Sequence, residues 1–225
     1  MTRTQDPTTS QRWRTRVAGL VAGVLVGVAV AWVAWGGGHS HAGAVEPSNR
    51  VQEQALLAAV RRSERATFTV EGSFRRTTDD GKHVEDPEVI VQRPPDRLTF
   101  GFGGWSGTVG GRTVQCVRDG RHGPFTSCAT PPRPAPTPDE AVRLRQLLEG
   151  DQPLYRASDL GSGCYQLRLI RDVELEPEYG KRAVLCFDRS TNAPTRRLIE
   201  HAHATDDTRE DHVSSRVDPA DLELP

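Results

Sequence analysis

A long, uninterrupted apolar run dominates the hydrophobic pattern of the chain. Residues 17–35 read VAGLVAGVLVGVAVAWVAW and contain no charged or strongly polar side chain. At about 1.5 Å of helix rise per residue, this run spans the roughly 30 Å hydrocarbon core of a bilayer, so it predicts one transmembrane helix. Arg12, Arg14 and Arg16 precede the run, whereas residues 36–45 hold no Lys or Arg. The positive-inside rule then predicts a cytoplasmic N-terminus and a main domain outside the cell membrane.

A cleaved signal peptide is the alternative interpretation of this segment. Residues 42–44 read Ala-Gly-Ala, the small-residue pattern of a cleavage site, but the apolar run is longer than a signal-peptide core and ends well before that site. The pattern therefore favours a signal-anchor. Under either interpretation, the rest of the chain is exported. Gly19, Gly23 and Gly27 lie on one face of the predicted helix and form a candidate surface for a helix–helix dimer.

The polar and apolar pattern divides the chain into four parts. We expect a cytoplasmic tail at 1–16, the transmembrane helix at 17–35, a linker at 36–47 and one extracytoplasmic domain at 48–225. In this domain, a helical period over 48–65 gives way at Thr67 to the period of two that is typical of strands. Thr137, Pro138 and Glu140 form a capping box that predicts a second helix ending near Gly150. Further strands are predicted at 88–93, 97–102, 113–117, 164–170, 182–188, 195–205 and 211–217.

The order of these segments, helix then strands and again helix then strands, indicates an α+β fold. Such an order predicts a curved antiparallel sheet with the helices on one face. A register in which Cys164 faces Cys186 places Gln166 opposite Val184 and gives the two strands a common apolar surface.

All four cysteines lie in the exported part, where the compartment permits disulfides. Four cysteines allow three pairings, and the spacing favours two local bridges, Cys116 with Cys128 and Cys164 with Cys186. A zinc site would require closely spaced Cys-x-x-Cys pairs, which the sequence lacks, so we expect no metal at the cysteines.

Charge restricts the kinds of partner. The tail holds four of the 29 basic residues and one of the 30 acidic ones, so the exported part is mildly acidic. Without a basic field, nucleic acid is excluded as a main partner.

Candidate catalytic residues are few. The sequence has neither a nucleophile elbow nor a phosphate-binding loop, so we expect no enzymatic activity and no cofactor. A histidine and aspartate cluster near the C-terminus could form a metal site if two of its histidines share one strand face, but an exposed polar hairpin is the favoured interpretation. The cluster comprises His201, His203, Asp206, Asp207, Asp211 and His212.

Several strings resemble the lipoprotein-carrier superfamily, which includes LolA-like, LppX-like and RseB-like domains. They are TFTVEGSF at 67–74, VQRPPDRLTF at 91–100, LCFDRSTNAPTRRLIEH at 185–201 and the closing DLELP. The resemblance implies a half-barrel of the bacterial cell envelope: an incomplete, curved antiparallel barrel with helices on its concave face over a hydrophobic cavity. It also implies the cavity-lining residues Phe68, Val70, Phe74, Leu98, Phe100 and Phe102.

Two functions follow from this resemblance. The first is a membrane-anchored domain that holds a lipid or acylated ligand in the cavity, acting beside the membrane because a short linker prevents shuttling. The alternative is a regulatory or assembly protein that contacts a membrane-protein partner without a bound ligand. A large enclosed apolar cavity would favour the first, and side chains filling that space would favour the second.

Overall fold

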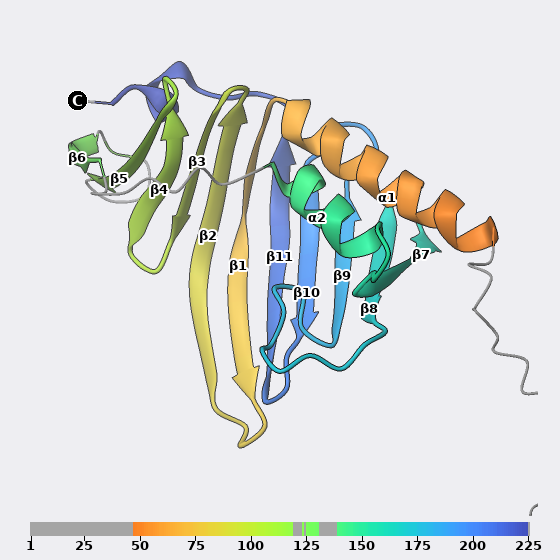
Figure 1. Ribbon diagram of the computed structural model, residues 1–225. Helices are drawn as coiled ribbons and strands as arrows, with labels where there is room; N and C mark the ends of the chain where they lie inside the picture. Colours follow the sequence, from red (N-terminus) through yellow and green to blue (C-terminus); the bar gives the residue numbers. More distant parts are fainter. Residues whose placement is uncertain (1–46, 119–122, 124, 131–138, 225) are drawn as a thin grey trace, which may run out of the picture. The chain divides into compact units, whose positions relative to one another are not determined.

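The computed structural model describes residues 47–118, 123, 125–130 and 139–224 (Figure 1). The chain divides into residues 1–42 and 43–225, and the described residues belong to the second unit. The predicted tail at 1–16, the transmembrane helix at 17–35 with its glycine face, and linker residues 36–46 lie outside the described residues. Among the residues that are described, no helix has the length and apolar character needed to cross a bilayer.

Two α-helices, eleven strands and one short 3-10 helix make up the described domain. In chain order they are α1 (Pro47–Arg65), β1 (Phe68–Thr78), β2 (His83–Arg93), β3 (Asp96–Gly101), β4 (Gly104–Val109), β5 (Arg112–Arg118), β6 (Phe125–Ala129), α2 (Glu140–Leu148), β7 (Tyr155–Gly161), β8 (Cys164–Leu169), β9 (Arg182–Phe187), β10 (Pro194–Glu200), β11 (Ala204–Ser214) and η1 (Pro219–Leu222).

All eleven strands form one open, curved antiparallel sheet in the order β6-β5-β4-β3-β2-β1-β11-β10-β9-β8-β7 (Figure 1). The first block of strands runs outward from β1 to the edge at β6. The second block starts at the opposite edge with β7 and runs inward to β11, which pairs with β1. The first and last strands of the chain therefore meet in the middle of the sheet.

Both helices lie over the same face of the sheet, which we call the inner face (Figure 1). Leu56, Leu57 and Val60 form the buried stripe of α1, as the helical period predicts. Gln92 of β2 holds the end of this helix, since its Nε2 donates to the carbonyl oxygens of Ser63 at 2.6 Å and Ala66 at 2.9 Å. A buried amide thus provides donors for carbonyl groups at the C-terminal end of the helix.

Two apolar cores lie at the two ends of the sheet. The first joins α1 and α2 to β7, β8 and β9, with Leu57, Leu144 and Leu167 fully buried. The second surrounds Trp105 in strands β2 to β6 and includes Leu222 of the C-terminal segment. Alternation along the strands places this second core on the opposite, outer face of the sheet.

Both predicted disulfides are confirmed. Cys116 bonds to Cys128 between β5 and β6, and Cys164 bonds to Cys186 between β8 and β9. The predicted register of β8 against β9, with Gln166 opposite Val184, is confirmed as well. Each disulfide therefore joins neighbouring strands near one end of the sheet.

The structure departs from the sequence prediction at three places. Residues 104–109, for which no strand was predicted, form strand β4. The strands predicted at 195–205 and 211–217 end and begin elsewhere, with the turn between β10 and β11 at 201–203, because the charged side chains of β11 pair with arginines on neighbouring strands. Helix α2 has Asp139 as its N-cap residue and no side-chain cap, while Oε1 of Glu64 accepts the hydrogen bond of the Ala141 amide at 2.9 Å.

Candidate functional site

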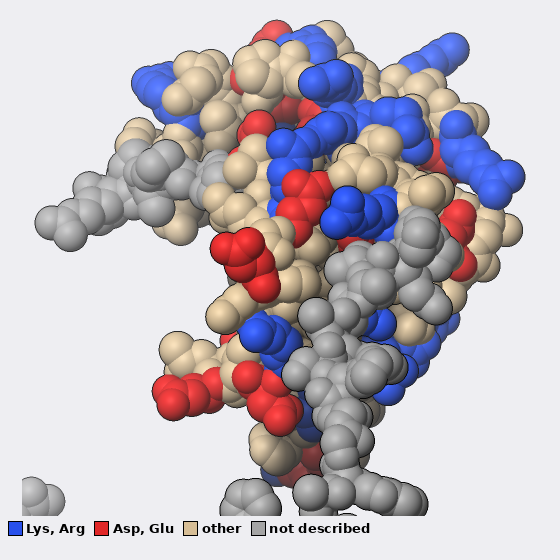
Figure 2. Space-filling model, turned by 45° about the vertical axis from the view of Figure 1, so that its right-hand side comes forward, with Lys and Arg blue, Asp and Glu red and all other residues tan. Residues whose placement is uncertain are grey.

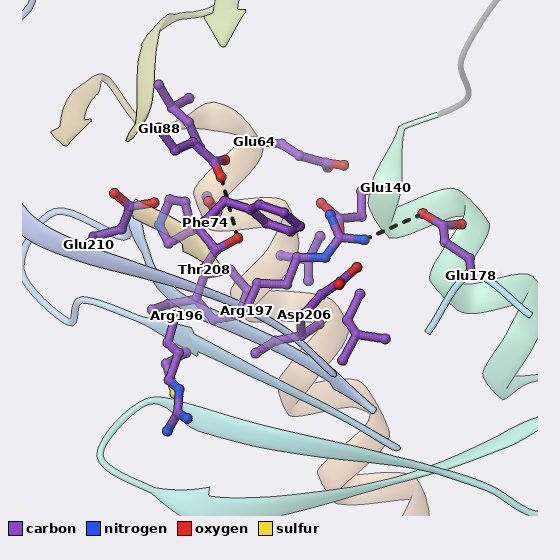
Figure 3. Close-up of a pocket in the computed structure, with 18 of the residues that line it drawn as sticks. Glu64, Phe74, Glu88, Glu140, Glu178, Arg196, Arg197, Asp206, Thr208 and Glu210 are labelled. Atoms are coloured by element: carbon purple, nitrogen blue, oxygen red, sulfur yellow. Dashed lines mark hydrogen bonds and ion pairs between the residues drawn. The ribbon is translucent and has the colours of Figure 1, made fainter. Parts of the chain in front are cut away.

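A cavity of about 390 Å³ lies on the inner face, between the two helices and the middle of the sheet. Strands β2, β1, β11, β10 and β9 form its floor, and residues of α1 and α2 border it (Figure 3). Acidic and basic side chains are interspersed on the side of the molecule seen in Figure 2, with acidic groups bordering the hollow at its left. The cavity therefore lies among charged side chains of both signs.

The floor of the cavity is apolar in its central part. Phe74, Ile90, Leu185, Phe187 and Ile199 come from four strands and face the helices. The period of two along each strand brings them to the same face, and Ile90 lies directly opposite Val70 of β1. The floor can therefore accommodate an apolar group of moderate size.

Two carboxyl groups lie over a glycine at one side of this floor. Gly72 of β1 pairs with Glu88 of β2 and, across a bulge in the register, with Glu210 of β11. A Cβ atom at Gly72 would lie 2.7 Å from Oε2 of Glu210 and 1.9 Å from the Arg209 carbonyl oxygen. The glycine thus leaves the space that the Glu210 carboxyl group occupies.

The environment of this pair favours the protonated form. Burial raises the pKa of Glu88, and the hydrogen bond from Thr208 Oγ1, at 3.3 Å, only partly offsets the effect. Burial, together with repulsion from Glu88 and Asp211, raises the pKa of Glu210 to about 8. Oε2 of Glu210 is fully buried and has no hydrogen-bond partner among the described residues. The pair therefore retains unused capacity to bind a donor or a cation.

A network of charged groups forms the wall near α2. Glu178 lies 3.4 Å from Arg143 of α2 and 3.9 Å from Arg197 of β10, and the second contact is drawn in Figure 3. Tyr179 Oη donates to Glu140 at 3.1 Å. These contacts link the loop after β8 to the second helix and to the sheet.

The predicted histidine and aspartate cluster is dispersed. His201 contacts Asp206 at 3.1 Å, and Asp206 is held by two hydrogen bonds of 2.6 Å from Arg76. Burial opposes ionisation of Asp206, but the hydrogen bonds and charge of Arg76 outweigh it and lower its pKa. His203 lies in the exposed turn beside Asp79.

The remaining members of the cluster lie elsewhere. Asp207 is bound by Arg196 and Arg209, while Asp211 and His212 belong to a separate part of β11. Within 47–118, 123, 125–130 and 139–224, no group of three or more His, Cys, Asp or Glu residues is arranged to hold a metal ion.

The six residues implied as cavity lining occupy three environments. Phe74 lines the cavity, while Phe68 and Val70 are fully buried beside it in a small cluster with Ile90. Leu98 and Phe100 pair with Val91 and Val89, so they face the outer side and belong to the core around Trp105. Phe102 is 74% exposed in the turn after β3, where its ring centroid lies 5.3 Å from the ring centroid of Phe74. Side chains alternate between the two faces along each strand, which explains why Phe74 points inward while Leu98 and Phe100 point outward.

Comparison with known proteins gives matches at the level of structure. No family model and no curated protein sequence matches the chain significantly. Similar solved structures include MucB, at 11% identity and a TM-score of 0.42, covering 78% of this chain and 63% of that one. The Pseudomonas aeruginosa MucA/MucB complex matches at 11% identity and a TM-score of 0.42, covering 78% and 61%. A LolA superfamily protein from Nitrosomonas europaea matches at 10% identity and a TM-score of 0.29, covering 77% and 98%.

The chain thus spans 61–63% of the length of these MucB structures. Its own topology, one open curved antiparallel sheet with two helices over one face, is the half-barrel that the sequence resemblance implied. The strand order and the placement of the helices in the described domain therefore establish the half-barrel topology by themselves.

Proposed function

We propose that the chain is a membrane-tethered extracytoplasmic regulatory domain that binds a segment of a partner protein in the inner-face cavity. The observation that carries this proposal is the lining of the cavity, where six carboxylate and three arginine side chains surround a small apolar floor. The carboxylates are Glu64, Glu88, Glu140, Glu178, Asp206 and Glu210, and the arginines are Arg97, Arg196 and Arg197. Sites for apolar ligands are lined predominantly by apolar side chains with few polar groups.

An acyl chain matches this lining poorly. It would remove water from the charged lining, and above all from Glu88 and Glu210, without offering these two carboxyl groups a hydrogen bond, and such burial is unfavourable. A protein segment offers both apolar side chains for the floor and donors for the carboxylates. The lipid-binding function predicted from the sequence remains the second candidate, because Phe74, Ile90 and Phe187 form an apolar surface large enough to contact part of a chain.

The tether and the two disulfides support the cellular location in this proposal. The apolar run at 17–35 with its preceding arginines favours a single-pass anchor with the N-terminus inside. Two disulfides in the domain are typical of an oxidising compartment outside the cytoplasm. A domain in this position meets other membrane proteins and secreted chains directly.

Site-specific photocrosslinking in the native host tests the proposal. The photoreactive amino acid benzoylphenylalanine replaces Phe74 in the full chain, and a matched variant carries it at Arg75, the next residue, which faces the opposite side of the sheet. After irradiation, mass spectrometry identifies the adduct. We expect a protein adduct that maps to one segment at position 74 and is absent at position 75.

Two other results would contradict the proposal. A lipid-sized adduct at position 74, together with a stoichiometric lipid in native mass spectra of the purified chain, would establish the acyl-ligand function instead. The same adducts at both positions, or none at position 74, would show that the cavity does not receive a partner segment.

A further inference from the structure

The carboxyl groups around the cavity differ in whether they already have partners. Glu64 accepts from the Ala141 amide, Glu140 accepts from Tyr179, and Glu178 lies beside Arg143 and Arg197. Asp206 is held by Arg76 and His201. These four carboxylates already form hydrogen bonds or ion pairs within the protein, so they stabilise the walls of the cavity.

Glu88 and Glu210 form the exception. Glu88 receives one long hydrogen bond from Thr208, and Oε2 of Glu210 is buried without any partner. The charges of Arg97 of β3 and Arg197 of β10 act on Glu88, but Arg97 donates its Nη1 to Gln92 at 2.8 Å and Arg197 lies beside Glu178. In Figure 3, the Glu88 and Glu210 side chains lie on the same side of Phe74, away from Glu140 and Glu178. A group that entered the cavity here would meet two carboxyl groups that feel the charge of Arg97 but make no direct ion pair with a described side chain.

Aromatic rings lie beside the pair. Phe74 is two residues from Gly72 on the same strand face, and Phe102 contacts its ring edge-to-face. Phe102 has a φ of 51°, which is uncommon for a non-glycine residue, and its amide donates to the Asp86 carboxylate. The backbone thus holds an aromatic side chain that remains 74% exposed at the edge of the cavity. Aromatic rings attract cations, and strained backbone positions are concentrated at functional sites.

We propose that the cavity recognises a positively charged side chain, a lysine ammonium or arginine guanidinium, with the cation at Glu88 and Glu210 and its alkyl stem against Phe74. This assignment rests on the proposed partner-binding function and specifies what the partner segment must carry. The cation supplies the donor that Oε2 of Glu210 lacks. The cavity volume of about 390 Å³ lies near the lower end of the range for drug-sized ligands, which suits a few side chains.

Isoleucine methyl signals give a direct test, because the sequence contains only Ile90, Ile170 and Ile199. The first and last line the cavity, whereas Ile170 does not, so it serves as an internal control. The full chain, labelled at the isoleucine δ-methyl groups and held in nanodiscs, is titrated at neutral pH with phenylbutylamine, phenylbutanol and phenylbutyrate. These probes share one apolar part and carry a cationic, a neutral and an anionic end.

We expect phenylbutylamine to shift the Ile90 and Ile199 signals, and to bind about tenfold more tightly than phenylbutanol, with phenylbutyrate weakest. Replacing both carboxyl groups in Glu88→Gln/Glu210→Gln should remove this preference without weakening phenylbutanol. The control variant Glu85→Gln changes a carboxylate on the outer face of β2, paired with Arg75, and should keep the preference.

The outcomes separate this inference from the function on which it rests. Equal binding of the three probes, or a preference that survives in the double glutamine variant, would overturn the cation site while leaving the crosslinking result to decide partner binding. The absence of any shift would also overturn it. If the amine preference is found but the adduct at position 74 is a lipid, the cationic group belongs to a lipid amine, and both the protein partner and the lysine or arginine assignment fail.

Discussion

The two ends of the sheet differ from its middle in what their side chains do. At the ends, the helices pack on β7 to β9, and Trp105 lies in an apolar core of β2 to β6. In the middle, where β1 meets β11, carboxyl groups face a cavity. A disulfide joins neighbouring strands at each end, and none lies in the middle of the described sheet. The two larger apolar cores and both disulfides thus lie at the ends, and the stability that they provide allows the middle to keep buried acidic groups that folding alone does not favour.

Truncating one side chain at an end of the sheet and one in the middle gives the strongest test of the difference between these regions. Leu57→Ala removes a fully buried residue of the helix-covered core and should lower the free energy of unfolding by about 2–5 kcal/mol. Phe74→Ala removes a larger side chain, but one that already borders empty space, so we expect a loss below about 2 kcal/mol. Denaturant unfolding followed by circular dichroism measures both. A larger loss for Phe74→Ala would show that the cavity region is part of the stabilising core.

Removing the disulfides tests whether the two ends act independently. Cys116→Ala/Cys128→Ala opens a loop with a sequence separation of 12, and Cys164→Ala/Cys186→Ala one of 22. The chain-entropy model gives a loss of about 3 kcal/mol for each, slightly more for the longer loop. Because the bridges lie at opposite ends of the sheet, their effects should add in the variant that lacks both. Thermal unfolding of the three variants measures these losses. A loss of stability in the variant without both disulfides that differs clearly from the sum of the two separate losses would contradict the independence of the two ends.

A glycine substitution tests the packing in the middle itself. Gly72→Ala would place a Cβ 1.9 Å from the Arg209 carbonyl oxygen, so the backbone of β1 or β11 must move. We expect a loss of about 1–3 kcal/mol, as for other overpacked sites. Gly101→Ala is the matched control on β3, because no atom lies within 4 Å of a Cβ at that position. Equal effects of the two substitutions on the unfolding midpoint would mean that Gly72 has no special role.

The sequence predicted best the two strands that a disulfide joins near one end of the sheet. Alternation together with the cysteine positions was enough to predict the Cys164 to Cys186 register, because both signals are local to two neighbouring strands. Strand β4 was missed, since Gly104 and Gly107 mimic a loop and only pairing with β3 and β5 makes it a strand. The turn at 201–203 was misplaced because charged residues resemble a turn until their ion pairs are known.

The carboxyl pair could not be predicted from local patterns at all. Glu88 and Glu210 are far apart in the sequence and become neighbours only because β1 pairs with β2 on one side and β11 on the other. One signal was present, namely Gly72 inside the alternating segment TFTVEGSF, since a glycine in a strand often marks a bulge or a close approach. The same topology placed Leu98 and Phe100 on the outer face, which sequence spacing within one strand cannot decide.

The smallest expected effect is the change in the free energy of unfolding with pH that the protonation of Glu210 causes. Its pKa is about 8 in the folded protein against an ordinary value of 4.5, so the folded state binds the proton more tightly than the unfolded state does. The free energy of unfolding should therefore fall as the pH rises from about 4.5 to 8, by roughly 1–2 kcal/mol after allowing for partial exposure.

Glu210→Gln should remove most of this fall, because an amide does not titrate. Its stability should match that of the unmodified chain near pH 5 and exceed it at pH 8.5, when unfolding is measured across this range. Glu85→Gln on the outer face should leave the profile unchanged. If Glu210→Gln is no more stable than the unmodified chain at pH 8.5, the Glu210 carboxyl group is well solvated, and the middle of the sheet does not hold the destabilising charge that distinguishes it from the ends.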